Sequence, residues 1–129
     1  MSILLDTCGL LWWTLDPDQL SHEALKACEK MERGEGFVSS ISLWELSIKV
    51  KNKKLDMGIS IEKYVDKLYQ LGYLKILPVD EKVWLKNLSL PWSHRDPADR
   101  TIVATAKIRN YGLVTSDKRI RKFYEKCIW

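Results

Sequence analysis

The sequence has few of the residues that build disulfide or zinc sites. Its three cysteines, Cys8, Cys28 and Cys127, are odd in number and show no C-x-x-C spacing, so no disulfide framework is indicated. Only His22 and His94 are available beside them, which argues against a Cys/His zinc cluster. We therefore interpret the cysteines as small buried side chains.

Long apolar segments are also missing. No apolar run reaches the roughly 18 residues that a membrane span needs, and Asp6 interrupts the apolar start MSILLDTCGLLWWTL. That start has no basic region, so we do not expect a secretory signal. Repeats, low-complexity segments and linkers are absent. We expect one domain over residues 1–129, located in the cytoplasm and not associated with a membrane.

What the chain does contain is a core and a slight excess of positive charge. Hydrophobic residues make up 46% of the sequence, too many for a disordered chain. Lys and Arg number 21 against 17 Asp and Glu, a net charge of +4. This excess favours a nucleic-acid partner only weakly, because many unrelated domains have it.

Short apolar runs alternate with helical patterns along the whole chain. The runs predict strands at 2–5, 36–39, 73–79 and 113–115, with 127–129 as an edge strand. The patterns predict helices at 7–15, 22–34, 42–54, 60–72, 80–88, 97–112 and 117–125. This alternation is typical of an α/β fold with a mainly parallel sheet and right-handed crossovers.

Four carboxylates stand near transitions from an apolar run to a helical pattern: Asp6, Glu45, Asp99 and Asp117. In a parallel sheet, the transitions from strand to helix lie together outside the carboxyl ends of the strands. Acids gathered there repel one another unless a cation joins them, and hard divalent cations take carboxylate oxygens. The sequence therefore predicts a metal site in which these four residues are the ligands and the catalytic groups.

Helix capping is the structural alternative for each acid. Asp6 and Asp117 would cap the helices that follow them, and Glu45 would complete a capping box with Ser42. Asp96 followed by Pro97 reads as an N-cap, which puts Asp99 in the first helical turn. Capping does not require a carboxylate at four successive strand ends, and a capping carboxylate keeps an oxygen for a metal.

Several polar residues flank the acids. Thr7 and Thr115 would orient a carboxylate or a metal-coordinated water, or else make local turn hydrogen bonds. His94 would contact substrate or shuttle a proton, or else serve as an ordinary loop residue. Two basic groups would bind RNA phosphates or form solvated faces. They are Lys49, Lys51, Lys53 and Lys54, and Lys118, Arg119, Arg121, Lys122 and Lys126.

The order of these motifs resembles the PIN-domain family over the whole chain. LLDTCGLLW is similar to its opening strand and first acid, and SSISLWELSIK to the segment that carries its Glu. HRDPADRTIVATA and LVTSD are similar to its third and fourth acidic blocks. The VapC-type toxins of toxin–antitoxin pairs are the subgroup with the greatest resemblance.

The resemblance implies a three-layer α/β/α fold with a central, mainly parallel sheet of four or five strands. It also implies an endoribonuclease that uses Mg²⁺ or Mn²⁺ and a metal-activated water to hydrolyse RNA phosphodiester bonds. Asp6, Glu45, Asp99 and Asp117 fall on the family's four acidic positions, and Asp96 is an extra acid with a capping or peripheral role. A homodimer and an antitoxin that covers the acidic pocket are the implied partners. The alternative is a PIN-like module that binds RNA or protein without cleavage.

Overall fold

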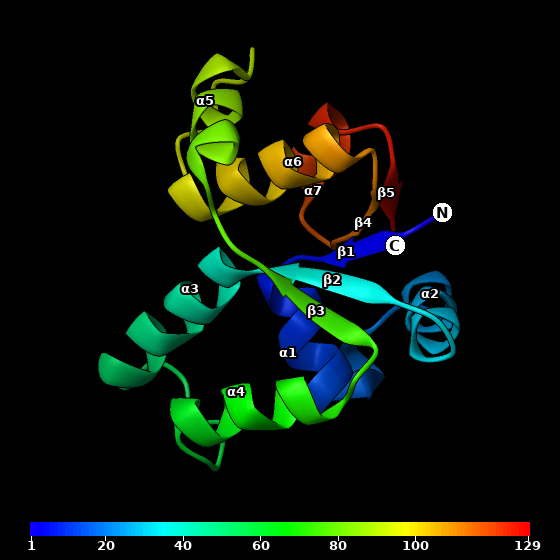
Figure 1. The fold of residues 1–129 in the computed structure, drawn as a ribbon, viewed down its shortest axis with the longest axis vertical. Helices are drawn as coiled ribbons and strands as arrows, with labels where there is room; N and C mark the ends of the chain where they lie inside the picture. Colours follow the sequence, from blue (N-terminus) through cyan, green and yellow to red (C-terminus); the bar gives the residue numbers. More distant parts are fainter.

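A five-stranded, wholly parallel sheet forms the centre of the molecule (Figure 1). The structure is a computed structural model that describes residues 1–129. The strands are β1 (Ile3–Leu5), β2 (Gly36–Ser39), β3 (Leu74–Leu77), β4 (Gly112–Val114) and β5 (Cys127–Ile128). Their order across the sheet is β3-β2-β1-β4-β5. The predicted α/β fold with a parallel sheet is confirmed.

Seven α-helices and one 3₁₀ turn connect the strands. The helices are α1 (Thr7–Leu15), α2 (His22–Glu32), α3 (Ser40–Lys51), α4 (Ile61–Gln70), α5 (Glu81–Ser89), α6 (Pro97–Arg109) and α7 (Lys118–Phe123), and the 3₁₀ turn is η1 (Pro17–Gln19). None of the helices is long and apolar enough to cross a membrane.

Each face of the sheet carries its own hydrophobic core, because successive strand side chains point to opposite sides. Ile3 and Leu5 of β1 pack with residues of α1, α2, α3 and α4. Leu4 points the other way and packs with residues of α5, α6 and α7. Figure 1 shows these two helical layers on opposite sides of the sheet. The three-layer α/β/α arrangement is therefore confirmed.

Tertiary contacts shift some predicted boundaries. Helix α3 begins at Ser40 with Ser39 as its N-cap, two residues before the predicted start. Helix α6 ends at Arg109, where Asn110 takes a left-handed conformation, and Gly112 opens β4 instead of ending the helix. The cysteine prediction is wrong for Cys8, which is exposed.

Candidate active site

The predicted acidic residues lie at the carboxyl ends of the strands, beside the point where the order of the strands reverses. From β1 the chain moves outward to β2 and β3, and it then returns to place β4 on the other side of β1. Leu5 pairs with Val114, so β1 and β4 end side by side. Asp6 follows β1 directly, and Asp117 follows β4 after a short loop. Open parallel sheets bind their ligands at such a switch point.

Three of the acids cap the helices that they precede, as predicted. Oδ1 of Asp6 accepts a hydrogen bond from the amide of Gly9 at 2.7 Å. Oδ1 of Asp117 accepts from the amides of Arg119 and Ile120 at 2.8 and 3.2 Å. Oδ1 of Asp96 accepts from the amide of Asp99 at 2.9 Å, which starts α6. Each cap uses one carboxylate oxygen, so capping leaves the second oxygen of each acid available.

Asp6 is the most deeply placed of the acids, with only 6% of its surface exposed. Burial raises its pKa from the usual 3.8 to about 6, against hydrogen bonds from Thr115 and Gly9 that lower it. The negative charges of Asp99 and Asp117 raise the pKa further. Three carboxylates contributed by three segments of the chain therefore share one electrostatic environment.

Asp99 is held by the predicted neighbour His94. The imidazole Nε2 lies 2.7 Å from Oδ2 of Asp99, and the side chains are 9% and 23% exposed respectively. Burial raises the pKa of Asp99, the hydrogen bond from His94 lowers it, and the charges of Asp96 and Asp117 raise it again. His94 thus fixes the orientation of one carboxylate group and leaves Oδ1 of Asp99 free of that bond.

Glu45 approaches the same region from α3, where it is half-buried. Partial desolvation raises the pKa of the Cys8 thiol, and the charges of both Asp6 and Glu45 raise it further. Cys8 is therefore a common neighbour of Glu45 and Asp6. The predicted capping box of Glu45 with Ser42 is wrong, because Ser39 caps α3 and Ser42 is buried inside the helix.

The two predicted threonines differ in what they contact. Oγ1 of Thr115 accepts a hydrogen bond from the amide of Asp117 at 3.1 Å, and its side chain also stabilises the ionised form of Asp6. Thr115 therefore links two of the acids. Thr7 instead donates to Oγ of Ser42 at 2.9 Å, which joins the start of α1 to α3. Its observed contact is with a hydroxyl and not with a carboxylate.

Arg100 is a site-forming residue that sequence reasoning missed. Its Nη1 donates to the carbonyls of Trp92 and His94 at 2.6 and 2.9 Å. Its other nitrogens donate to Asn87 Oδ1 and to the carbonyls of Asn87 and Leu90. The guanidinium therefore ties the loop that carries His94 onto α6. The only available signal was an Arg directly after Asp99, and no local pattern reveals that its acceptors are carbonyls.

Comparison with known proteins identifies the family of this chain. The family model of the PIN domain matches residues 3–126. The chain belongs to the PIN-domain family. It is also 31% identical over 121 residues to Ribonuclease VapC22 of Mycobacterium tuberculosis, which covers 93% of this chain and 90% of that protein.

Solved structures share the fold of this chain. A toxin–antitoxin complex from Klebsiella pneumoniae superposes with a TM-score of 0.68 at 18% identity, over 98% of this chain and 96% of that chain. FitAcB from Neisseria gonorrhoeae superposes with a TM-score of 0.64 at 26% identity, over 92% of this chain and 89% of that chain. The similarity to the Klebsiella pneumoniae complex, at 18% identity, concerns the fold alone.

The donor set of this PIN domain fits a hard divalent cation. No group of three or more His, Cys, Asp or Glu side chains is arranged to hold an ion directly. Mg²⁺ does not require such a cage, because it keeps several waters and binds through one or two carboxylates together with substrate phosphates. The mutual repulsion of Asp6, Asp99 and Asp117 is an electrostatic cost that a cation would relieve.

Proposed function

We propose that this protein is a metal-dependent endoribonuclease, the toxin of a VapBC-type toxin–antitoxin pair. The observation that carries the proposal is the electrostatic coupling of Asp6, Asp99 and Asp117 at the switch point of the sheet. Membership of the PIN-domain family and the relative named as a ribonuclease support it.

Asp6 and Asp99 would hold Mg²⁺ or Mn²⁺, directly or through water, with Glu45 and Asp117 completing the set. The ion would supply a Lewis acid that activates water and neutralises phosphate charge. Thr115 orients the carboxylate of Asp6 and accepts from the backbone amide of Asp117, and His94 orients Asp99 through its imidazole. These contacts reduce the freedom of the acids before substrate arrives, which is the preorganisation that catalysis requires.

Asp96 and Thr7 have supporting roles in this proposal. Asp96 caps α6 and so sets the position of Asp99 in the first turn. Thr7 joins α1, which begins at Asp6, to α3, which carries Glu45. Neither side chain needs to contact the substrate for the site to work.

The proposed partners are an RNA substrate, an antitoxin that covers the acidic pocket and a second copy of the chain, all in the cytoplasm. The Klebsiella pneumoniae structure of related fold is described as a toxin–antitoxin complex, which supports the antitoxin. Trp84, Leu85 and Leu88 of α5 are 45%, 66% and 80% exposed. Apolar side chains grouped on a surface in this way are typical of an interface, which supports a homodimer.

The test is cleavage of a single-stranded RNA by the purified protein with Mg²⁺ or Mn²⁺, and again after addition of EDTA. We expect cleavage that EDTA stops and that Asp99→Asn abolishes without unfolding the protein. Asp80→Asn is the control for the loss of one carboxylate, because the Asp80 side chain accepts from the Val83 amide at the start of α5 and is not among the charges that shift the pKa of Asp6 or Asp99. Cleavage that survives EDTA would exclude the metal mechanism. Tight RNA binding without any cleavage would favour the non-catalytic module.

A further inference from the structure

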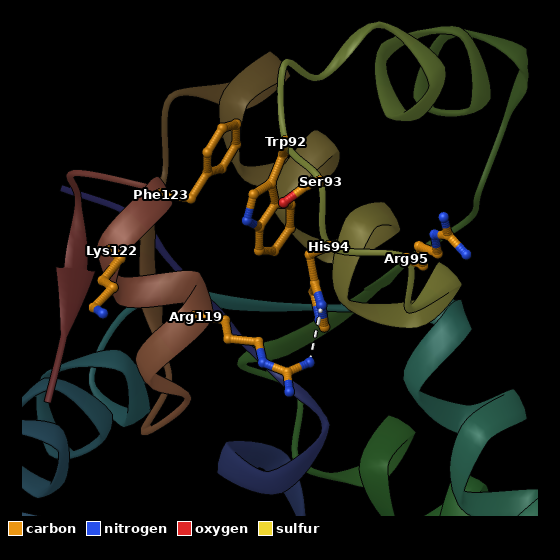
Figure 2. A pocket seen from close by; sticks show the side chains of 7 residues that line it. All are labelled: Trp92, Ser93, His94, Arg95, Arg119, Lys122 and Phe123. Carbon is orange, nitrogen blue, oxygen red and sulfur yellow. Dashed lines mark hydrogen bonds between the residues drawn. The ribbon is translucent and has the colours of Figure 1, made fainter.

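A groove of about 600 Å³ lies beside the acidic residues and has the opposite charge. It is lined by Trp92, Ser93, His94, Arg95, Arg119, Lys122 and Phe123 (Figure 2). Three of these residues are permanent cations and none is acidic. His94 belongs to the groove and also contacts Asp99, so the groove begins where the acidic site ends.

The aromatic residues of the groove pack against one another and not outward. The rings of Trp92 and Phe123 stack with centroids 4.7 Å apart and planes inclined by 6°. His94 packs against Trp92 at 4.8 Å, and Lys107 lies over the ring of Phe123. These contacts, with the hydrogen bonds from Arg100 to the loop, fasten the His94 loop to α7. The rings therefore act as a rigid wall.

Arg119 is the groove cation that contacts the His94 imidazole, the neighbour of Asp99. Its Nη1 lies 3.3 Å from Nδ1 of His94, as the dashed line in Figure 2 shows. A guanidinium only donates hydrogen bonds, so Nδ1 of His94 accepts and Nε2 carries the proton that it donates to Asp99. Arg119, His94 and Asp99 therefore form one chain of hydrogen bonds from the groove to the acidic site.

The groove cations have no carboxylate partners. The one close pair of a basic and an acidic side chain is His94 with Asp99, and Arg95, Arg119 and Lys122 form no salt bridge. Arg119 uses one nitrogen for the bond to the His94 imidazole and keeps its remaining donors on the exposed side of α7. Arg95 and Lys122 flank it on opposite sides of the groove (Figure 2). Unpaired guanidinium forks are suited to the oxygens of a phosphate.

We propose that this groove is a phosphate-binding subsite for the RNA strand, in which Arg119 binds a phosphate of a nucleotide next to the cleaved bond. The proposal rests on the proposed function, because it places the rest of the same substrate. RNA is favoured over a protein segment because the lining is cationic, lacks acids and adjoins the acids proposed to cut the strand. The aromatic rings contribute shape and rigidity, since they already stack on one another.

The experiment measures binding of a fluorescein-labelled single-stranded RNA by anisotropy, in EDTA so that the probe is not consumed, across a series of salt concentrations. Arg119→Gln removes the charge and keeps a side chain of similar length. We expect it to weaken binding about tenfold at low salt. The slope of log K against log salt should become shallower by about 0.7, the value for one phosphate contact on a single strand.

Two further variants separate a local contact from a general charge effect. Arg33→Gln removes the same charge from the C-terminus of α2, just before β2 and so at the opposite edge of the sheet, and should leave the slope unchanged. Arg119→Lys retains the charge without the fork, so it should keep the slope and bind only a few-fold more weakly. This variant also serves if Arg119→Gln fails to fold.

The outcomes distinguish the subsite from the proposed activity. Equal affinity and slope for Arg119→Gln and wild type would overturn the subsite and would leave the groove to a protein partner. An equal loss in Arg33→Gln would also overturn it, because the effect would then reflect net charge. If the wild type binds RNA through Arg119 but does not cleave it in Mg²⁺ or Mn²⁺, the subsite stands and the proposed activity fails.

Discussion

Replacement of Asp6 by Asn should stabilise the folded protein in metal-free buffer. Asp6 is 6% exposed, and burial is the largest cause of a pKa that rises from 3.8 to about 6. The folded state therefore binds the Asp6 proton more tightly than the unfolded state. Stability is lost as the pH rises through the interval from about 4 to about 6, and it stays reduced above that interval.

The size of the effect follows from that difference in pKa. Each pKa unit corresponds to about 1.4 kcal/mol, so a rise from 3.8 to about 6 costs up to about 3 kcal/mol at pH 7.5. Asn removes the charge but keeps the helix cap, because its amide oxygen can accept from the Gly9 amide as Asp6 does. For a chain of this length the gain corresponds to a rise in melting temperature of roughly 10 °C.

The assay is urea unfolding of wild type and Asp6→Asn in EDTA at several pH values. The stability difference should be largest above pH 6 and should vanish below about pH 4, where the carboxyl group is protonated in both states. Asp80→Asn, an exposed cap of the same kind, should change stability by less than about 0.5 kcal/mol. A variant that is less stable than wild type at pH 7.5 would refute this reasoning, because it would show that the hydrogen bonds to the ionised carboxylate outweigh the cost of its burial and of the neighbouring charges.

Two further changes test the supports of the site. Arg100→Lys should lower the free energy of unfolding by about 2–3 kcal/mol, measured by urea unfolding. One ammonium cannot replace a guanidinium that donates to five acceptors. An effect as small as that of the exposed Arg109→Lys would refute this prediction. Gly9→Ala should slow RNA cleavage about tenfold or more, since its Cβ would lie 3.0 Å from Asp6 Oδ1 and 3.2 Å from the carbonyl of Val114. Gly34→Ala, whose Cβ would lie 3.9 Å from the nearest atom, is the control and should cleave normally.

The helix starts and the strands were predictable because their signals are local. A capping side chain bonds to an amide two or three residues away, so Asp6, Asp96 and Asp117 could be recognised as caps before any fold was known. Short apolar runs between helical patterns likewise indicated a parallel sheet, including its edge strand at the end of the chain. Ser42 shows the limit of such reasoning, because a buried contact with Thr7 decides its position and Ser39 caps the helix instead.

The sequence by itself determined which side chains stand at the ends of its strands and that several of them are acids. Only the tertiary structure decided which strands are neighbours, and the placement of β4 beside β1 brings Asp117 to Asp6. The same holds for the contacts of His94 with Asp99 and Arg119 and for the loop held by Arg100. The contact of His94 with Arg119 joins residues that are distant in the chain. The contacts of His94 with Asp99 and with Arg100 join near neighbours, but they depend on the conformation of an irregular loop, which no spacing along the sequence encodes.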